Sequence, residues 1–154
     1  MTDLRIRKAT AEDAPALCAL VQRAIRTNSS AYPAMIIEMI CANFEPEKFL
    51  ERMAERDVFA ATLGDEFAGT VSFSLPRSKL YSLFIEPRVQ RSGTGQQLVR
   101  YTERHAEALG CTFLQLSAAI PARPFYERLR YDTLKFEERV DDGATWLMRK
   151  SLRG

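Results

Sequence analysis

The spacing of apolar residues changes at Val58, and that change limits the folds open to this chain. From Ala11 to about Arg26 the apolar residues recur at helical spacing. Pro33 and Pro46 then stand where the first turn of a helix tolerates proline. From Val58 onward the chain reads as short strand-like runs separated by turn residues. We therefore expect the N-terminal third to be mostly helical and the remainder to build a sheet.

Runs of helices, then a hairpin, then strand–helix–strand, favour one sheet covered by helices. We predict an α/β (α+β) fold in which a central, mixed, mostly antiparallel sheet is flanked by helices, with residues 1–154 forming a single domain. Thr10 is a good N-cap for the first helix, with Asp13 three residues later. The predicted helices are Ala11 to about Arg26, Pro33–Asn43, Pro46–Glu55, Gly95–Leu109 and Pro124–Leu129. The predicted strands are a first one from Leu4 to Thr10, Val58–Leu63, Phe67–Leu75, Lys79–Ile85, Thr112–Ser117, Leu134–Val140 and Ala144–Lys150.

Composition and charge argue against several classes of protein. No apolar run approaches the roughly 18 residues of a membrane span, and no secretory signal is evident, so we expect a cytoplasmic protein without a membrane partner. The net charge of +2 comes from interleaved basic and acidic residues, so nucleic acid is not an expected partner. Cys18, Cys41 and Cys111 are scattered among apolar residues, which is typical of reduced core thiols. With one histidine, His105, the chain offers too few zinc ligands, and we expect no metal.

A glycine-rich turn joins the strand Lys79–Ile85 to the long helix. Its sequence, Gln90-Arg91-Ser92-Gly93-Thr94-Gly95-Gln96, leaves unpaired backbone N–H groups at the positive end of that helix. The turn can therefore bind an anion such as a phosphate, although a simple structural turn is the alternative. Leu98 stands where a dinucleotide fingerprint needs a small residue, and the lysine of a nucleotide-triphosphate loop is missing.

Together with a second segment, this turn resembles the signatures of the GNAT acetyltransferase superfamily. The first signature, Gln/Arg-x-x-Gly-x-Gly/Ala, is matched by Gln90 to Gly95, and Tyr81–Pro87 is similar to the strand that precedes it. Ala122–Leu129 resembles the second signature, in the family's order and at roughly its 30-residue separation. The combination is far more specific than either motif.

The resemblance implies an acetyl-CoA site and an N-acetyltransferase. Backbone amides from Arg91 to Gln96 would hold the pyrophosphate, and the main chain of the preceding strand would pair with the pantetheine arm. The implied cofactor-binding residues are Leu83, Phe84, Ile85, Gln90, Arg91, Ser92, Gly93, Thr94, Gly95, Gln96 and Tyr126.

The resemblance also places Tyr126 beside the thioester sulfur. A phenol is protonated at neutral pH, so Tyr126 is the predicted general acid for the departing thiolate. An aromatic that packs beside Phe125 is the alternative. The amine would attack directly, without a covalent enzyme intermediate. A strand N–H, that of Phe84 or a near neighbour, would stabilise the negative oxygen.

The base that accepts the amine proton is less well defined. Glu86 at the strand end is the second predicted catalytic residue, and Glu38 and Tyr81 are further candidates, with water as the alternative. For Glu38 a solvated helix face is favoured, and His105 is better explained as packed against the sheet.

Two departures from the family pattern are visible. Arg130 precedes Tyr131 where the family commonly has glycine, so that turn is expected to differ. The asparagine often found after the strand beyond the long helix is missing from Ser117–Pro121.

The acceptor site is expected at the first two helices, the loop Thr27–Tyr32 and the closing hairpin near Asp141-Asp142-Gly143. Glu38, Glu45, Asp141 and Asp142 are acids that can attract a cationic amine. We expect a small primary amine or an amino-acid-like acceptor, with a protein lysine or N-terminus next. A non-catalytic acetyl-CoA-sensing module and a purely structural interaction domain stay open as alternatives. Exposed strand edges favour a homodimer.

Overall fold

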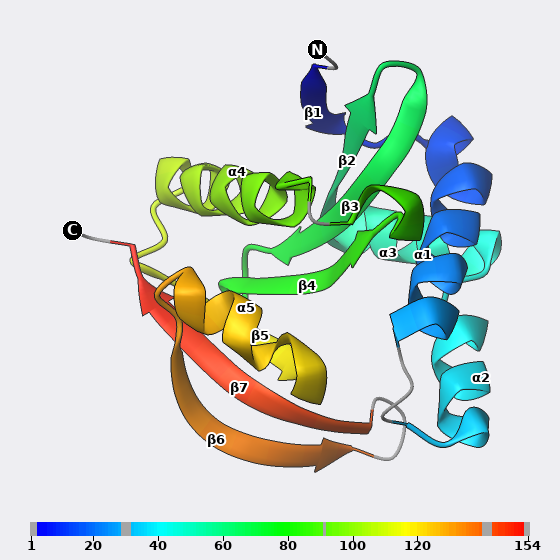
Figure 1. The fold of residues 1–154 in the computed structure, drawn as a ribbon. Coiled ribbons are helices and arrows are strands. Elements are labelled where there is room, and N and C mark those ends of the chain that lie inside the picture. The colour runs from blue at the N-terminus through cyan, green and yellow to red at the C-terminus, as the bar shows by residue number, and fades with distance from the viewer. Residues whose placement is uncertain (1–2, 29–31, 91, 140–142, 153–154) are drawn as a thin grey trace.

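The computed structural model describes residues 3–28, 32–90, 92–139 and 143–152, and it has a seven-stranded sheet (Figure 1). The strand order is β1-β2-β3-β4-β5-β7-β6. Neighbouring strands are antiparallel except β4 and β5, which run parallel, so the predicted mixed, mostly antiparallel sheet is confirmed. The strands are β1 Leu4–Lys8, β2 Asp57–Leu63, β3 Glu66–Ser74, β4 Lys79–Ile85, β5 Phe113–Ala119, β6 Asp132–Arg139 and β7 Gly143–Ser151.

Five α-helices flank this sheet (Figure 1). The bounds of α3 and β4 match the prediction, and most other bounds agree within one or two residues. The first helix starts later than predicted, because residues 11–13 form a 3-10 turn, and it continues through Thr27 and Asn28. The remaining loop residues before Tyr32, and the acids at 141 and 142, lie outside the described residues. The helices are α1 Ala14–Asn28, α2 Ala34–Ala42, α3 Pro46–Glu55, α4 Thr94–Ala108 and α5 Arg123–Arg128, with 3-10 turns η1 Ala11–Asp13, η2 Pro87–Val89 and η3 Ile120–Ala122.

The central strands bury side chains on both faces of the sheet. In β2, Phe59 and Ala61 belong to a core cluster with Leu98 of α4, while Val58 and Ala60 belong to a second cluster with the apolar stripe of α1. Successive side chains of a strand point to opposite faces, so a single strand serves both clusters. Burial of apolar area in these two clusters is the main stabilising contribution.

Strands β4 and β5 separate soon after they meet. Within the described residues their ladder contains only Lys79 with Gln115 and Leu80 with Leu116. Ser82 then has a positive φ of 53°, and the pairing of β4 with β3 shifts register at this point. A bulge of this kind bends a strand and redirects its edge. The main chain of β4 beyond Leu80 therefore faces an opening between the two strands, which we call the β4–β5 fork.

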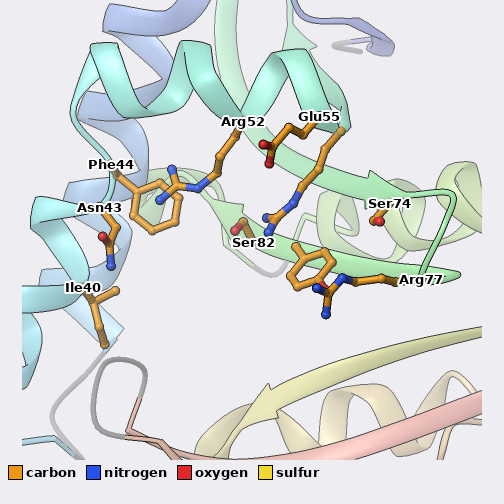
Figure 2. Close-up of a pocket in the computed structure, with 10 residues that line it drawn as sticks. Ile40, Asn43, Phe44, Arg52, Glu55, Ser74, Arg77 and Ser82 are labelled. Carbon is orange, nitrogen blue, oxygen red and sulfur yellow. The ribbon is translucent and has the colours of Figure 1, made fainter.

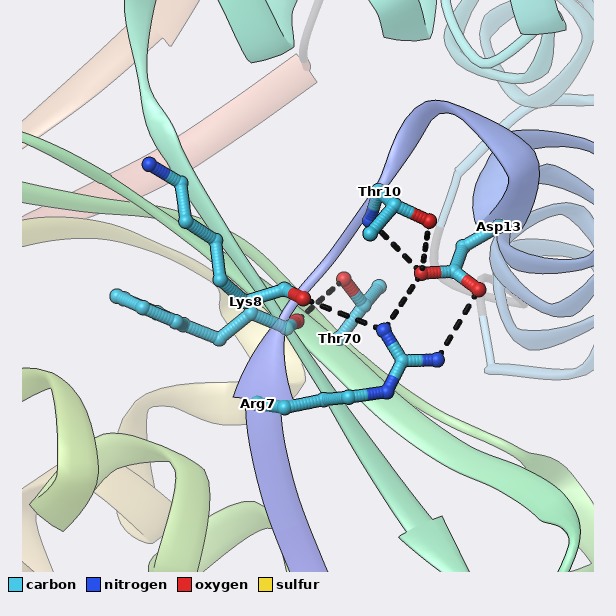
Figure 3. A network of polar contacts seen from close by, with 6 residues as sticks. Arg7, Lys8, Thr10, Asp13 and Thr70 are labelled. Carbon is cyan, nitrogen blue, oxygen red and sulfur yellow. Dashed lines mark hydrogen bonds and ion pairs between the residues drawn. The ribbon is translucent and has the colours of Figure 1, made fainter.

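A polar network fixes the start of α1 to β1 (Figure 3). Asp13 Oδ2 accepts hydrogen bonds from the Thr10 amide at 2.8 Å and from Arg7 Nη1 at 2.7 Å, and Arg7 Nη2 donates to Asp13 Oδ1 at 3.1 Å. The hydrogen bond from Arg7 and that from the Thr10 amide lower the pKa of Asp13 to about 2. Thr10, predicted as the N-cap of the first helix, caps the 3-10 turn η1 that leads into α1, and Asp13 pairs with both Thr10 and Arg7.

Replacing Asp13 with Asn should lower the free energy of unfolding at pH 7 by about 1 kcal/mol, because the partly exposed ion pair and the capping interaction are weakened. The folded pKa lies below the ordinary value of 3.8, so this stability is present above pH 4 and is lost as the pH falls toward 2. Urea unfolding of both proteins at pH 7, 4 and 3 should show the difference shrinking with acidity. The exposed neighbour Glu12→Gln is the control, and a pH-independent difference would contradict the assignment.

Candidate active site

The glycine turn, the end of β4 and the start of α5 converge at one place. Gly93 is the N-cap of α4 with φ 86°, a left-handed conformation that favours glycine. A Cβ on Gly95 would lie 3.3 Å from Phe125 Cζ and 3.6 Å from Ile85 Cγ1. A larger side chain at Gly95 would therefore displace either the second predicted signature or the end of β4. The structure thus brings α5, a distant segment of the sequence, against the glycine turn and the strand that precedes it.

The turn presents backbone donors at the beginning of α4. The Gln97 amide donates to Gly93 O at 3.0 Å, so the amides of Thr94, Gly95 and Gln96 precede the first bond of the helix. Ser92 Oγ and Thr94 Oγ1 are hydrogen-bonded at 2.7 Å, which orders the turn. This arrangement suits a phosphate group, since the amides and the helix dipole both favour negative charge.

Two further predicted residues border the described part of this turn. Gln90 follows η2 in an extended conformation and leads into the turn. Arg91 lies outside the described residues, so its predicted contact with a phosphate stays a prediction. The amide oxygen of Gln96, in the orientation that satisfies the group, accepts from Arg100 Nη2 at 3.0 Å.

The three predicted residues of β4 are partly buried and anchored on both sides of the sheet. Leu83 and Ile85 pack against the cluster that contains α4, whereas Phe84 packs against the cluster of α1. The Phe84 ring meets Phe44 edge to face, with centroids 5.3 Å apart. Their side chains thus hold the strand in place while its main chain borders the fork.

Tyr126 is buried between two aromatic rings. Its centroid lies 5.0 Å from Phe125 and 5.9 Å from Tyr131. Burial raises the pKa of Tyr126, so the phenol stays protonated throughout the neutral range. Among the described residues none forms a hydrogen bond with its hydroxyl, which leaves the proton available for donation.

The turn after α5 forms although the family's common glycine is replaced by arginine. Arg130 has φ 77°, the left-handed conformation that glycine adopts most readily. The Tyr131 amide donates back to Tyr126 O at 3.1 Å, as in a normal helix end. The departure at Arg130 therefore leaves the second signature's geometry in place.

Glu86 is buried in a cluster of ion pairs. Arg23 Nε of α1 donates to Glu86 Oε1 at 3.3 Å, and Arg88 Nε lies 3.5 Å from the same oxygen. The hydrogen bond from Arg23 and the charges of both arginines hold the pKa of Glu86 below its ordinary value. A lower pKa weakens a carboxylate as a base, so this environment disfavours the predicted role. Nothing in the sequence spacing indicated Arg23 as its partner.

Two other residues considered as the base, Glu38 and His105, form contacts that explain them as structural residues. Glu38 is exposed and paired with Arg26, which lowers its pKa. His105 Nε2 lies 2.9 Å from Asp57 Oδ2, and its ring packs edge to face on Phe59 of the sheet, as predicted for a packed histidine. Tyr81 differs from these, because it lines the cavities described next.

Two adjoining cavities lie on the α1–α2 side of the fork. The larger one has a volume of about 390 Å³ and is bounded by α2, α3 and β4 (Figure 2). The smaller one, of about 230 Å³, reaches Ser117 of β5 and Thr145 of β7. Residues that line both cavities are Ile40, Phe44, Tyr81 and Ser82.

The two cavities adjoin elements that were expected to form the acceptor site, and the larger cavity also contains arginines that were not predicted. Tyr32 lines the smaller cavity and donates a hydrogen bond to Ala144 O at 2.9 Å, which links the α1–α2 connection to the closing hairpin. The arginines that line the larger cavity, Arg52, Arg56 and Arg77, were not among the predicted site residues. No local pattern signalled them, because Arg56 is the extended residue that follows α3 and Arg77 lies in the β3–β4 connection, so only the tertiary structure brings them to Arg52.

The cysteines and acids form no second chemical site within the described residues. Cys18 and Cys41 are buried, and desolvation raises the pKa of Cys18 to about 11, which makes it an inert core thiol. No group of three or more potential metal ligands occurs in the described part of the chain. None of the described helices is long and apolar enough to cross a membrane.

Comparison with known proteins connects this geometry to a family. Residues 28–152 match the family model described as the acetyltransferase (GNAT) domain. The chain is 25% identical over 155 residues to the uncharacterized N-acetyltransferase YafP of Escherichia coli (strain K12), covering 99% of this chain and 97% of that protein.

Solved structures share the whole fold. A GCN5-related N-acetyltransferase from Rhodopseudomonas palustris matches with a TM-score of 0.91 and 23% identity, covering 98% of this chain and 97% of that one. The PaiA N-acetyltransferase from Thermoplasma acidophilum, solved in complex with coenzyme A, has a TM-score of 0.81 and 18% identity, covering 97% and 99%. Because the family model spans most of the chain and the fold agrees throughout, this chain belongs to the GNAT family and is an N-acetyltransferase.

Proposed function

We propose that this protein transfers an acetyl group from acetyl-CoA to the primary amine of a small or amino-acid-like acceptor by direct attack. The observation that carries the proposal is the convergence of the Gly93–Gly95 turn, Ile85 and Phe125 beside the β4–β5 fork. In this proposal the glycine turn binds an anion, and this turn, the β5-facing edge of β4 and the Tyr126 phenol border one opening. The acceptor enters from the opposite side, through the two cavities.

The proposed acetyl-CoA contacts are mostly backbone. Amides from Arg91 to Gln96 bind the pyrophosphate, with Gln90 leading into the turn, while the main chain from Leu83 to Ile85 pairs with the pantetheine amides. Gly93 and Gly95 keep side chains out of the approach path. The residues present therefore fit acetyl-CoA. Most of the proposed contacts do not depend on which side chain is present, except at Gly93 and Gly95, where a larger side chain would block the approach.

Acetyl-CoA supplies an activated acetyl group, and the protein supplies position and charge. The new bond joins the amine nitrogen to the acetyl carbon as the carbon–sulfur bond breaks; the amine loses one proton and the sulfur gains one. The N–H of Phe84 or its neighbour stabilises the negative oxygen. The pKa of a phenol lies above that of a thiol, and burial raises the pKa of Tyr126 further, so Tyr126 donates a hydrogen bond to the departing sulfur, which takes its proton from solvent water.

For Glu86 we propose a positioning role in place of the base role expected from the sequence. Its ion pair with Arg23 joins α1 to the end of β4, and the resulting low pKa favours a permanently ionised carboxylate. Water then carries away the amine proton. A cytoplasmic location, a single domain over 1–154 and a homodimer stay predictions from the sequence, and light scattering at micromolar concentration tests the last.

Acetyl-CoA binding can be measured by calorimetric titration. Wild-type protein should bind near 1 μM, about −8 kcal/mol, and the Gly93→Val/Gly95→Val double variant should lose binding because both changes obstruct the turn. Gly64→Val is the matched control, since Gly64 also has positive φ but lies in the distant β2–β3 turn. Circular dichroism confirms that each variant is folded. Unchanged binding in the double variant would place the co-substrate elsewhere.

The role of Tyr126 is tested with Tyr126→Phe. We expect kcat to fall by about 10²- to 10⁴-fold while the acetyl-CoA affinity stays unchanged, because only the donated hydrogen bond is removed. Tyr101→Phe, a partly buried tyrosine on α4, should retain wild-type kcat. Wild-type turnover by Tyr126→Phe would reduce Tyr126 to a packing residue. Binding without turnover of any amine would instead favour the non-catalytic sensing module.

Glu86→Gln distinguishes a base from a positioning residue. We expect the free energy of unfolding to decrease by about 1 kcal/mol, because the buried Glu86 side chain loses its charge-assisted hydrogen bonds to the half-exposed Arg23. The pH dependence of kcat/KM should keep its shape, whereas loss of a base would remove the acidic limb of the profile. Arg23→Gln should reproduce the same stability change with the same unchanged profile. A flattened acidic limb in Glu86→Gln alone would restore the base assignment.

A further inference from the structure

The larger cavity gathers an excess of positive charge. Three arginine side chains line it, Arg52 and Arg56 near the end of α3 and Arg77 in the β3–β4 connection, against a single carboxylate, Glu55. Figure 2 shows Arg52, Glu55 and Arg77 around the cavity, with Ser74 and Ser82 between them. The remaining lining residues carry no formal charge. A cavity with this lining attracts anions and repels cations.

Aromatic rings hold two of these guanidinium groups. Arg52 Cζ lies 4.5 Å from the centroid of Phe44, and Arg56 Cζ lies 3.8 Å from the centroid of Tyr81. Stacking on a ring face restricts a guanidinium while its N–H donors, which lie in its plane, keep their directions. Such a group is prepared for two parallel hydrogen bonds to a carboxylate or phosphate.

The positive charge in the cavity is not cancelled by ion pairs at its outer residues. In the described part of the chain, neither Arg56 nor Arg77 forms an ion pair with a carboxylate. By contrast, Glu38, which was expected to attract a cationic amine, is already bound to Arg26. Lys79, whose Nζ lies 5.1 Å from the centroid of Tyr81, adds another cation at the border of the smaller cavity.

The larger cavity leads to the place of transfer. It shares Tyr81 and Ser82 with the smaller cavity, which in turn extends to Ser117 beside the fork. A ligand that spans both cavities can therefore have its anionic end among the arginines and its amine at the fork.

Resting on the proposed function, we infer that the larger cavity binds an anionic oxygen group of the acceptor, so that the acceptor is an amine that also carries a carboxylate or phosphate. Arg56 and Arg77 supply the donors, and Arg52 adds positive potential. Polyamines and aminoglycosides, which carry several positive charges, are disfavoured because Glu55 is the one acid among the described residues that line the cavity.

The test compares matched pairs of acceptors with and without the anion. 4-aminobutanoate, whose carboxylate and amine stand at opposite ends, is paired with 4-aminobutanamide, and 2-aminoethylphosphate with ethanolamine, with spermidine as the polycation. Wild-type protein should have a KM at least 10-fold lower for the anionic member of one pair, and that pair identifies carboxylate or phosphate as the preferred group. Equal or better use of the neutral members, or a preference for spermidine, would overturn the inference.

Variants of the cavity arginines test whether these residues cause the preference for an anionic acceptor. Arg56→Gln and Arg77→Gln should each raise the KM for the preferred anionic acceptor by about 10- to 100-fold, with kcat and the KM for its neutral partner changed little. Arg104→Gln, an exposed arginine on α4, should leave all constants unchanged. Equal losses for the anionic and neutral acceptors would show a merely structural role and refute the assignment.

Calorimetry separates this inference from the proposed function. Acetyl-CoA should bind both arginine variants as it binds the wild type, since neither residue lies at the glycine turn. If acetyl-CoA fails to bind the wild type, the proposed function fails. The anionic probes are then titrated alone, and binding that requires Arg56 and Arg77 still supports an anion site. If acetyl-CoA binds but no acceptor is turned over, the same titration is made on the acetyl-CoA complex, and absence of anion binding overturns the inference.

Discussion

The separation of β4 from β5 is the constraint on which the rest of the structure depends. Two parallel strands pair at only two positions and then diverge, and the bulge at Ser82 turns the edge of β4 toward the opening. A continuous sheet would satisfy that edge with another strand and leave no opening. Here β4 beyond Leu80 stays paired with β3 on one side, while its β5-facing edge has no strand partner among the described residues; a ligand with its own amides can pair with that edge.

Close packing around Gly69 keeps the fork and the glycine turn in a fixed relation. Gly69 of β3 pairs with Ile85, and a Cβ there would lie 2.9 Å from Ile85 Cδ1 and 3.0 Å from both Leu98 Cδ1 and Phe84 O. Helix α4 can therefore approach the sheet closely, which brings its N-terminus to the end of β4. The proposed anion site and the strand edge are therefore packed against one another, so a ligand that binds both would require little rearrangement of the protein.

Two groups of arginines contribute differently to this protein, one to its stability and the other to a local positive potential. Arg7, Arg23 and Arg26 neutralise acids and tie elements together, as Arg23 does by binding the buried Glu86. Arg56 and Arg77 instead line a cavity in which one carboxylate faces three guanidinium groups. The first group contributes to stability, whereas the second produces a local positive potential. The small net charge of the whole chain conceals this distinction.

The sequence alone determined the local features of this protein. Pro46, Thr10 with Asp13, and the change of apolar spacing at Val58 act over a few residues, so the helices and strands followed closely from them. Gln90–Gly95 and Ala122–Leu129, which resemble the two family signatures, indicated the family for the same reason, because each signature is a short run of residues. The tertiary structure decided which residues meet: Glu86 with Arg23, Gly95 with Phe125, and Arg52, Arg56 and Arg77 around one cavity. Those contacts join segments far apart in the chain, and they depend on strand order and helix packing, which no local pattern encodes.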